Sequence, residues 1–210
     1  MKKWALLFTG GKSPSLLDFD RALIPVCDFI YAADSGLDIA HKLGFKVDLA
    51  IGDFDSIQQK SLLDKQEIIT LPKEKDITDT EALLQLIEQK EIENYILIGG
   101  GEGRFDHLLH LYSLFSLYKP PQIWITAQEI IYLAKESFSI SNVDGKSVSI
   151  IPAIHKGSSR VSSKNLKWEL SNLLISMDSQ SISNVVIGGK LLLKVEGNPV
   201  FVTFPYKTTI

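Results

Sequence analysis

Val47-Asp48-Leu49-Ala50-Ile51-Gly52-Asp53-Phe54-Asp55-Ser56 joins an apolar run to a pair of aspartates. The run at 47–51 predicts a buried strand. Side chains alternate between faces in an extended backbone, so Asp53 and Asp55 are expected to point the same way where the strand ends. Carboxylates paired in this way suit a hard cation such as Mg²⁺, which is usually completed by water and substrate phosphates. A solvated turn would also contain Asp and Gly, so this stretch alone leaves both interpretations open.

Similar apolar runs occur on both sides of this stretch, and segments with helical spacing lie between them. The further expected strands are Lys3–Phe8, Phe29–Ala33, Tyr95–Ile98 and Ile123–Ile125. The expected helices are Ser15–Leu23 and segments that begin near Gly36, Thr78 and Leu108. Strands that alternate with helices indicate an α/β domain built on a Rossmann-like parallel sheet with flanking helices.

Polar residues gather after these strands. The clusters are Gly10-Gly11, Asp34, Asp53 with Asp55, Asp76 with Asp79, and Arg104 with Asp106. Each has an ordinary explanation; Thr78 and Glu81, for example, have the spacing of a helix capping box, and acids nearby favour a helix N-terminus. Ligands of parallel sheets bind outside the carboxyl ends of the strands, however. A shared edge rich in carboxylates, glycines and a few cations predicts a site for a metal ion and phosphate.

The glycine-rich segment Gly99–Gly103 joins a strand to a helix and is followed by Arg104-Phe105-Asp106-His107. Backbone amides of such a loop can approach a phosphate closely, and the helix N-terminus favours the anion. Arg104 can bridge phosphate oxygens in a forked contact. His107 and His110 lie three residues apart, a spacing that permits a zinc pair without implying one.

From about Glu136 the pattern changes to short alternating segments. Asp144-Gly145 has the composition of a hairpin turn. The expected strands are Phe138–Ile140, Ser147–Ile150, Leu173–Ile175, Val185–Ile187, Leu191–Val195 and Val200–Phe204. Because no long helical pattern appears, residues 135–210 are expected to form an antiparallel β-sandwich domain and residues 1–134 the α/β domain.

Composition excludes some classes of protein. The net charge of −3, with 22% charged and 45% hydrophobic residues, is ordinary for a globular protein and gives no basic surface for nucleic acid. No run approaches the ~20 apolar residues that span a membrane. The single cysteine, Cys27, cannot form an internal disulfide, so a reducing, cytoplasmic location is expected. Cys27 itself is expected to be a small buried hydrophobe and not a nucleophile.

Several motifs taken together resemble the thiamin pyrophosphokinase family. In the first domain they are Ala33-Asp34-Ser35-Gly36, Ile51-Gly52-Asp53-Phe54-Asp55-Ser56, Lys75-Asp76-Ile77-Thr78-Asp79-Thr80-Glu81 and Gly103-Arg104-Phe105-Asp106-His107. In the second they are Asn165-Leu166-Lys167-Trp168 and Ser181-Ile182-Ser183-Asn184. The order and approximate spacing of the motifs match the family, and the resemblance covers nearly the whole chain.

The resemblance implies transfer of pyrophosphate from ATP, the co-substrate, to the hydroxyl of thiamin, which gives thiamin diphosphate and AMP and requires Mg²⁺. It implies a homodimer whose active site lies at the subunit interface. The catalytic group would be Asp53, Asp55, Asp76 and Asp79, of which Asp53, Asp55 and Asp79 would hold the metal. ATP would be bound by Asp34, Gly36, Thr78, Arg104, Asp106 and His107, and thiamin by Trp168, Ser181, Ser183 and Asn184.

The chain departs from the family pattern at two positions. Ser35 stands where the family often has glycine, and Val185 stands where a glutamate often follows the Ser-Asn pair. Because Val185 falls in the second domain, a pyrophosphokinase acting on another heterocyclic alcohol, such as a hydroxymethylpterin, is an alternative. A nucleotide-sensing module without turnover is another, although it would have no need for four ordered acidic motifs.

Overall fold

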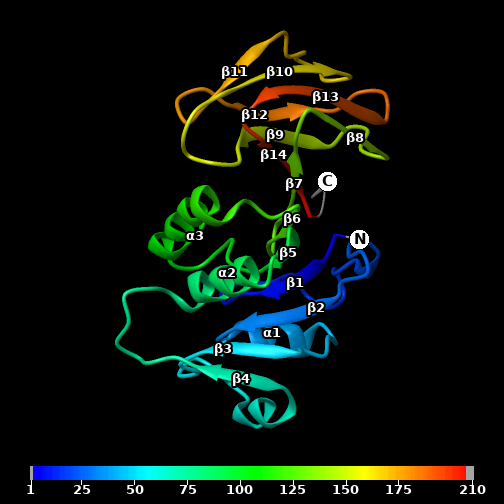
Figure 1. Ribbon diagram of the computed structural model, residues 1–210. Coiled ribbons are helices and arrows are strands. Elements are labelled where there is room, and N and C mark those ends of the chain that lie inside the picture. The colour runs from blue at the N-terminus through cyan, green and yellow to red at the C-terminus, as the bar shows by residue number, and fades with distance from the viewer. Residues whose placement is uncertain (1, 207–210) are drawn as a thin grey trace. The chain divides into compact units, whose positions relative to one another are not determined.

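The computed structural model describes residues Lys2–Tyr206 and divides into two compact units (Figure 1). Unit 1 comprises the chain up to Leu114 together with Pro121–Ala127. Unit 2 comprises Phe115–Pro120 and the chain from Gln128 onward. The strand β7 (Glu129–Ala134), which the sequence placed at the end of the first domain, pairs with a strand of unit 2.

Unit 1 contains a parallel sheet in the strand order β6-β5-β1-β2-β3-β4. The strands are β1 (Trp4–Phe8), β2 (Phe29–Ala33), β3 (Leu49–Gly52), β4 (Glu67–Thr70), β5 (Asn94–Ile98) and β6 (Ile123–Ile125). The helices are α1 (Gly36–Lys42), α2 (Asp79–Gln89) and α3 (Phe105–Tyr118), whose last residues belong to unit 2. β1 and β5 are apolar and almost wholly buried, which explains why their runs were easily predicted. The Rossmann-like arrangement is confirmed.

The predicted helix at Ser15–Leu23 is wrong. The segment forms turns and a short 3-10 helix, η1 (Arg21–Leu23), and Leu17 is 97% exposed. Side-chain oxygens here accept backbone N–H groups that a helix would use for its own hydrogen bonds. Asp18 N donates to Ser15 Oγ at 3.3 Å, and Ala22 N donates to Asp20 Oδ1 at 2.9 Å. Ser and Asp favour turns and caps over helix interiors for this reason.

The strand β4 was not among the predicted strands. It pairs with β3 at the end of the sheet order, and most of its residues are exposed. An edge strand of this kind has no continuous apolar run, so periodicity gives little sign of it. A second 3-10 helix, η2 (Lys60–Lys65), occupies the polar stretch before it.

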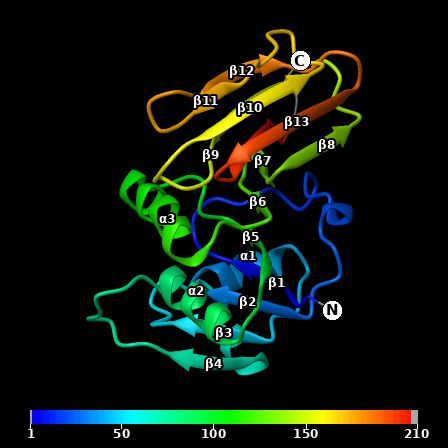
Figure 2. The ribbon, with the colours of Figure 1, turned by 45° about the horizontal axis from the view of Figure 1, so that its top comes forward.

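Unit 2 contains two antiparallel sheets, with strand orders β12-β9-β14-β7 and β11-β10-β13-β8 (Figure 2). The remaining strands are β8 (Ser137–Ser141), β9 (Ser147–Pro152), β10 (Ser159–Lys164), β11 (Leu173–Ile175), β12 (Ser181–Val185), β13 (Lys190–Gly197) and β14 (Val200–Pro205). Buried residues from both sheets share one apolar core, which includes Ile150, Val161, Leu191 and Val202. The predicted sandwich is confirmed.

The strand predicted at Val185–Ile187 is displaced. β12 ends at Val185, and Val186 instead forms an isolated bridge with Leu166. The register of β12 against β9 shifts between Ser181 and Asn184, and Ser183 has φ 55°. Such a bulge breaks the alternation of side chains that strand prediction relies on.

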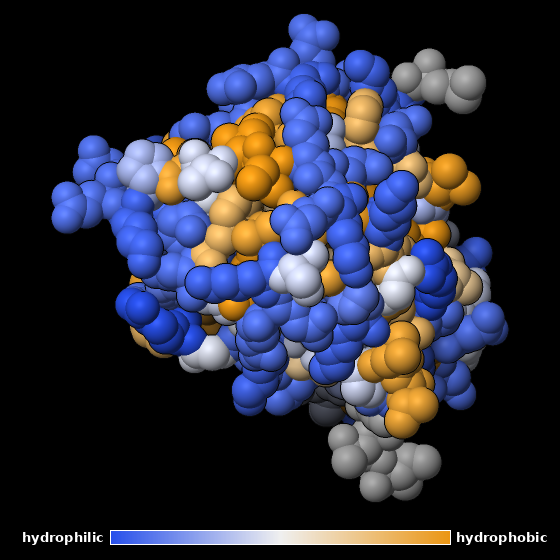
Figure 3. All heavy atoms as spheres, turned by 90° about the horizontal axis from the view of Figure 1, so that it is seen from below, coloured by the Kyte–Doolittle hydropathy of each residue, from blue (hydrophilic) through white to orange (hydrophobic). Residues whose placement is uncertain are grey.

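No helix in the described residues is long and apolar enough to cross a membrane. The face drawn in Figure 3 is largely hydrophilic, with smaller hydrophobic areas between the polar side chains. Apolar side chains scattered over a surface in this way are normal in globular proteins.

Cys27 provides the first testable prediction. Cys27 is only partly buried, and not fully buried as predicted. This partial burial, and secondarily the charge of Asp28, raises the pKa of its thiol to about 11. The reactive thiolate is therefore scarce at pH 8, and we expect a disulfide reagent to modify the folded protein about 10- to 100-fold more slowly than glutathione. Stopped-flow or spectrophotometric kinetics, repeated in urea to expose the thiol, measure this ratio. Equal rates in the folded and unfolded states would contradict it.

Candidate active site

A pocket of about 660 Å³ lies within unit 1. Its walls come from the segment after β1, the segment after β2, the loop that leads into α2, and the glycine-rich segment with the first part of α3. The lining residues are Thr9–Gly11, Ala33–Ser35, Ser56, Lys75–Thr80, Gly100, Glu102–Arg104, Asp106, His107, His110, Leu111 and Leu114. Four of the polar clusters that the sequence placed at the carboxyl ends of the strands therefore line one cavity, where parallel sheets bind their ligands, whereas Asp53 and Asp55 are not among its lining residues.

Three aspartates beside this pocket have the spacing of metal ligands. One carboxylate oxygen from each of Asp34, Asp53 and Asp55 lies within 4.8 Å of the others. Oδ1 of Asp34 is buried and has no hydrogen-bond partner, and the backbone of Asp34 has φ 44°. An unsatisfied buried carboxylate oxygen is costly, and a divalent cation would satisfy it. The oxygen donors present are of the type that Mg²⁺ prefers.

The local geometry of Asp53 and Asp55 differs from the predicted extended strand. β3 ends at Gly52, and Phe54 has φ 60°. Asp55 N donates to Asp53 Oδ1 at 3.2 Å, which is the contact of an Asx turn. The prediction that the two carboxylates lie close together is confirmed, but a turn and not strand alternation brings them together.

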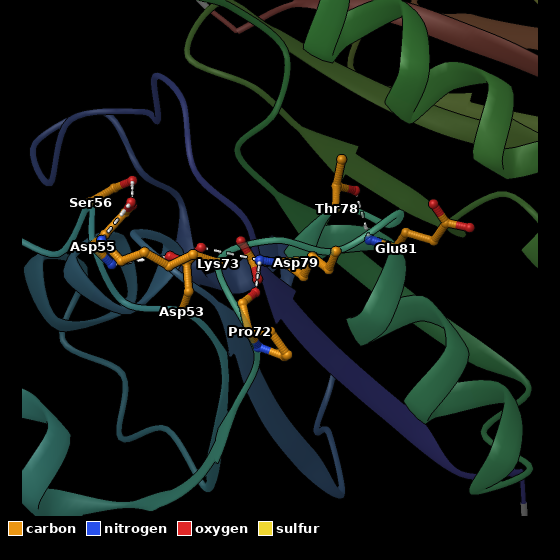
Figure 4. A network of polar contacts seen from close by, with 9 residues as sticks. Asp53, Asp55, Ser56, Pro72, Lys73, Thr78, Asp79 and Glu81 are labelled. Atoms are coloured by element: carbon orange, nitrogen blue, oxygen red, sulfur yellow. Dashed lines mark hydrogen bonds and ion pairs between the residues drawn. The ribbon is translucent and has the colours of Figure 1, made fainter.

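Lys75 lies between Asp53 and Asp79, two of the predicted catalytic acids. Figure 4 labels these two aspartates together with Asp55, Pro72 and Lys73. Its Nζ is 3.1 Å from Asp53 Oδ2 and 3.2 Å from Asp79 Oδ1, and it also donates to the Pro72 carbonyl at 3.1 Å. The Lys75 side chain is only 14% exposed. Lys73, in contrast, is 73% exposed, and its Nζ lies 3.6 Å from Asp55 Oδ2.

The surroundings shift the pKa values of this group in different directions. The backbone amide of Asp55, followed by Lys75, lowers the pKa of Asp53 despite its burial. Burial raises the pKa of Asp79, the Lys75 charge counteracts this, and the charges of Asp53 and Asp34 add to the rise. Burial alone would lower the pKa of Lys75, but its hydrogen bond to Asp53 and its ion pair with Asp79 raise it. The lysine is therefore held as a cation between the acids.

Two glycine segments meet at the ends of β1 and β5. Gly100 N donates to the Gly10 carbonyl at 2.9 Å, and a Cβ on Gly11 would lie 2.9 Å from the Glu102 carbonyl. Lys12 forms an ion pair with Glu102 at 3.1 Å across the same junction. Because glycine has no side chain, the backbone of these two segments can approach a phosphorylated ligand closely.

Arg104 and Asp106 are bound to each other by a forked pair in which Nε donates to Oδ1 at 3.1 Å and Nη2 donates to Oδ2. Both side chains are well exposed. The hydrogen bond from Arg104 lowers the pKa of Asp106, and His107 N also donates to its carboxylate. A phosphate would have to compete with Asp106 for the forked face of Arg104.

Most of the predicted ATP residues line the pocket, namely Asp34, Thr78, Arg104, Asp106 and His107. Thr78 also caps α2, because its side chain accepts from Glu81 N. Gly36 does not line the pocket. It is buried against β1, where a Cβ would lie 2.4 Å from the Phe8 carbonyl oxygen, so a glycine is needed there for close packing. His110 Nε2 lies 3.5 Å from Glu81 Oε2, an ion pair only if the histidine is protonated.

Sequence reasoning missed several polar residues that line the pocket, among them Thr9, Ser35, Lys75 and Glu102. Lys75 had a usable signal, because it stands four residues before Asp79 and therefore one helical turn away at a helix start. Glu102 had none, since an acid in a glycine-rich loop looks like an ordinary solvated residue.

The predicted thiamin residues all lie in unit 2. The Trp168 side chain is 56% exposed, and Lys167 Nζ sits 4.6 Å from the centre of its ring. Asn184 is buried and fixes the Trp168 backbone, donating from Nδ2 to Trp168 O at 2.7 Å and accepting from Trp168 N at 3.2 Å. The side-chain amide of Asn184 is thus used to position Trp168.

Ser181 precedes the bulge in β12, and Ser183 lies within it. Ser181 pairs with Ile150 of β9, and Ser183 N donates to Ser149 Oγ at 3.0 Å. Lys167 N also donates to the Val185 carbonyl at 2.8 Å. The two C-terminal motifs, separated in the sequence, are therefore hydrogen-bonded neighbours.

A parallel sheet with a glycine-lined pocket and acidic loops at its carboxyl edge defines an α/β protein that handles phosphorylated ligands. Residues 21–126 match the model of the thiamin pyrophosphokinase catalytic domain, and residues 134–196 match that of the thiamin pyrophosphokinase vitamin B1 binding domain. The chain belongs to the thiamin pyrophosphokinase family.

Individual proteins agree with this assignment. Thiamin pyrophosphokinase 1 of Caenorhabditis elegans is 30% identical over 164 residues, which cover 71% of this chain and 67% of that protein. The structure of a thiamin pyrophosphokinase family protein from Enterococcus faecalis matches with a TM-score of 0.73 at 21% identity, covering 99% of this chain and 100% of that one. The thiamin pyrophosphokinase of Geobacillus thermodenitrificans gives 0.75 at 20% identity, with 98% and 99% covered. These two structures support the fold.

Proposed function

We propose that this chain transfers pyrophosphate from ATP to the hydroxyl of thiamin, giving thiamin diphosphate and AMP, with Mg²⁺ held by Asp53, Asp55 and Asp79. One observation carries the catalytic part of the proposal. The acidic group of Asp34, Asp53 and Asp55 includes the unpartnered Asp34 Oδ1, and Asp34 lines a pocket that is also lined by Gly10, Gly11, Gly100 and Gly103. Carboxylates that hold a cation beside backbone that can approach phosphates are what pyrophosphoryl transfer needs.

The residues have separable tasks in this proposal. Asp53, Asp55 and Asp79 hold the cation, which supplies charge neutralisation to the phosphates when bound. Asp76 lies on the loop between Lys75 and α2, and it lines the pocket together with Lys75 and Asp79. Asp34, Gly36, Thr78, Arg104, Asp106 and His107 form the proposed ATP site. A carboxylate near the metal accepts the proton of the thiamin hydroxyl.

The thiamin site is proposed at Trp168, Ser181, Ser183 and Asn184. The exposed indole face of Trp168 can bind the cationic ring of thiamin, because aromatic faces attract cations. Asn184 holds that indole in place through its two hydrogen bonds to the Trp168 backbone. We further propose a homodimer in which a second copy completes the active site, and a cytoplasmic location consistent with the single free cysteine.

Product analysis tests the reaction directly. The purified protein is incubated with ATP, Mg²⁺ and thiamin, and AMP, ADP and thiamin diphosphate are separated by chromatography. We expect AMP and thiamin diphosphate to appear in equal amounts and ADP to stay at background. If AMP forms with a hydroxymethylpterin but not with thiamin, the assignment of thiamin as the acceptor is wrong. If ATP binds but neither acceptor gives AMP, the protein is a nucleotide-binding module without turnover.

Trp168 tests the substrate site separately from the ATP site. Trp168→Ala should raise the KM for thiamin about 10-fold or more, since a desolvated cation–π contact contributes up to ~2 kcal/mol. Trp168→Phe keeps an aromatic face, so its KM for thiamin should rise less than that of Trp168→Ala. The KM for ATP serves as the internal control and should stay unchanged in both variants. An unchanged KM for thiamin in Trp168→Ala would remove this residue from the site.

A further inference from the structure

Lys75 occupies the space between two carboxylates that the proposed function assigns to the metal ion. Its Nζ lies 3.1 Å from Asp53 and 3.2 Å from Asp79, and it bonds to the Pro72 carbonyl as well. We propose that Lys75 is a resident counter-cation that neutralises Asp53 and Asp79 in the metal-free protein and must release them when Mg²⁺ binds. This inference rests on the proposed function only in taking these acids as the metal ligands.

The charges around Lys75 give the first reason. Asp34, Asp53 and Asp55 form one acidic group, and the side chain of Asp79, 21% exposed, is close enough for the charges of Asp53 and Asp34 to act on it. Like charges in a partly buried site repel each other and destabilise the fold unless a cation lies between them. Lys75 is the cation that contacts two of these acids at once.

The second reason is that Lys75 and a metal ion need the same oxygen atoms. Both oxygens of Asp53 are already hydrogen-bonded, Oδ1 to the Asp55 amide and Oδ2 to Lys75 Nζ. Mg²⁺ requires near-octahedral geometry at 2.0–2.1 Å from its oxygen ligands, so an ammonium group cannot remain in hydrogen-bond contact on the same side. A metal ion that binds Asp53 and Asp79 from the side of Lys75 therefore competes with the ammonium group for these oxygens.

Lys73 shows that proximity alone does not give this role. It lies 3.6 Å from one acid, Asp55, and its side chain is 73% exposed. Exposed ion pairs of this kind contribute little because solvent screens them. Lys73 is therefore a matched control: it carries the same charge beside the same acidic group, but it bridges nothing.

The experiment measures metal affinity in the absence of nucleotide. Mn²⁺ is titrated into wild type, Lys75→Met and Lys73→Met, and free Mn²⁺ is followed by electron paramagnetic resonance. Removing the competing ammonium should tighten Mn²⁺ binding about 10-fold or more in Lys75→Met. Lys73→Met should change it by less than about 3-fold, as expected from a screened surface charge.

Thermal unfolding provides a second readout. Without metal, Lys75→Met should melt below wild type, because two partly buried carboxylates lose their shared partner. Saturating Mn²⁺ should raise its melting temperature by more than it raises that of wild type, since tighter binding stabilises the native state more. Lys75→Gln, which lacks the charge but keeps a donor, provides the same comparison if the methionine variant does not fold.

The outcomes separate the inference from the function. Equal tightening in the Lys75 and Lys73 variants, or weaker binding in Lys75→Met, would overturn the counter-cation role while leaving a metal site in place. No Mn²⁺ binding by wild type or any variant would overturn both the inference and the proposed metal ligands. Tight binding specific to the Lys75 variants supports the inference.

Discussion

Asp55→Asn is expected to lower the rate of thiamin diphosphate formation by at least about 10³-fold, equivalent to about 4 kcal/mol of transition-state stabilisation. Asp55 contributes one of the three closely spaced carboxylate oxygens. An amide at this position keeps the shape and the hydrogen bond from Ser56 Oγ, 3.0 Å long, but loses the charge that the cation requires. The loss should therefore fall on activity and not on folding.

The structure makes this a clean test. The Asp55 side chain is 50% exposed, and its ion pair with Lys73 contributes little to stability. The urea midpoint should thus match wild type, while Mn²⁺ affinity and turnover fall together. Asp64→Asn is the matched control, because Asp64 is an exposed acid of unit 1 that lies outside the group formed by Asp34, Asp53 and Asp55. Near-normal turnover in Asp55→Asn would remove Asp55 from the metal site.

The sequence predicted the place of the site better than its local geometry. Asp53 and Asp55 are indeed neighbours, but the positive φ of Phe54 places them in a turn that no alternation rule describes. Strand ends are predictable because buried apolar runs are distinctive, whereas the conformation just beyond them depends on tertiary contacts. The packing of Gly52 against Asp34, with a Cβ position 3.2 Å from Asp34 Cα, is one such contact.

Errors elsewhere have the same origin. The apolar residues of Ser15–Leu23 have helical spacing, but local side-chain hydrogen bonds prevail and leave Leu16, which belongs to the predicted apolar face, 59% exposed. Lys75 looks in the sequence like one of two similar lysines, and only the folded loop makes it a bridge and leaves Lys73 in solvent. Periodicity reports on which residues enter the core, and it carries no information about which polar residues meet.

Gly99→Ala should lower the free energy of unfolding by about 3 kcal/mol or more, the largest stability effect we expect from a single methyl group in unit 1. Gly99 has φ +99°, a conformation that costs an alanine about 1–2 kcal/mol. The methyl group would also lie 2.2 Å from the Thr9 carbonyl oxygen, a backbone atom that cannot rotate away. Two independent costs therefore fall on one residue.

Gly103→Ala separates those two costs. Gly103 also has a positive φ, +119°, but a Cβ there would meet nothing within 4 Å, so only the conformational cost of about 1 kcal/mol applies. Urea unfolding gives the free energy of unfolding of both variants. The difference between them is the cost of the close contact between the ends of β5 and β1. Because Gly100 N donates to the Gly10 carbonyl at this junction, Gly99→Ala should also weaken ATP binding. Equal stability of the two variants would mean that the ends of β1 and β5 separate without cost.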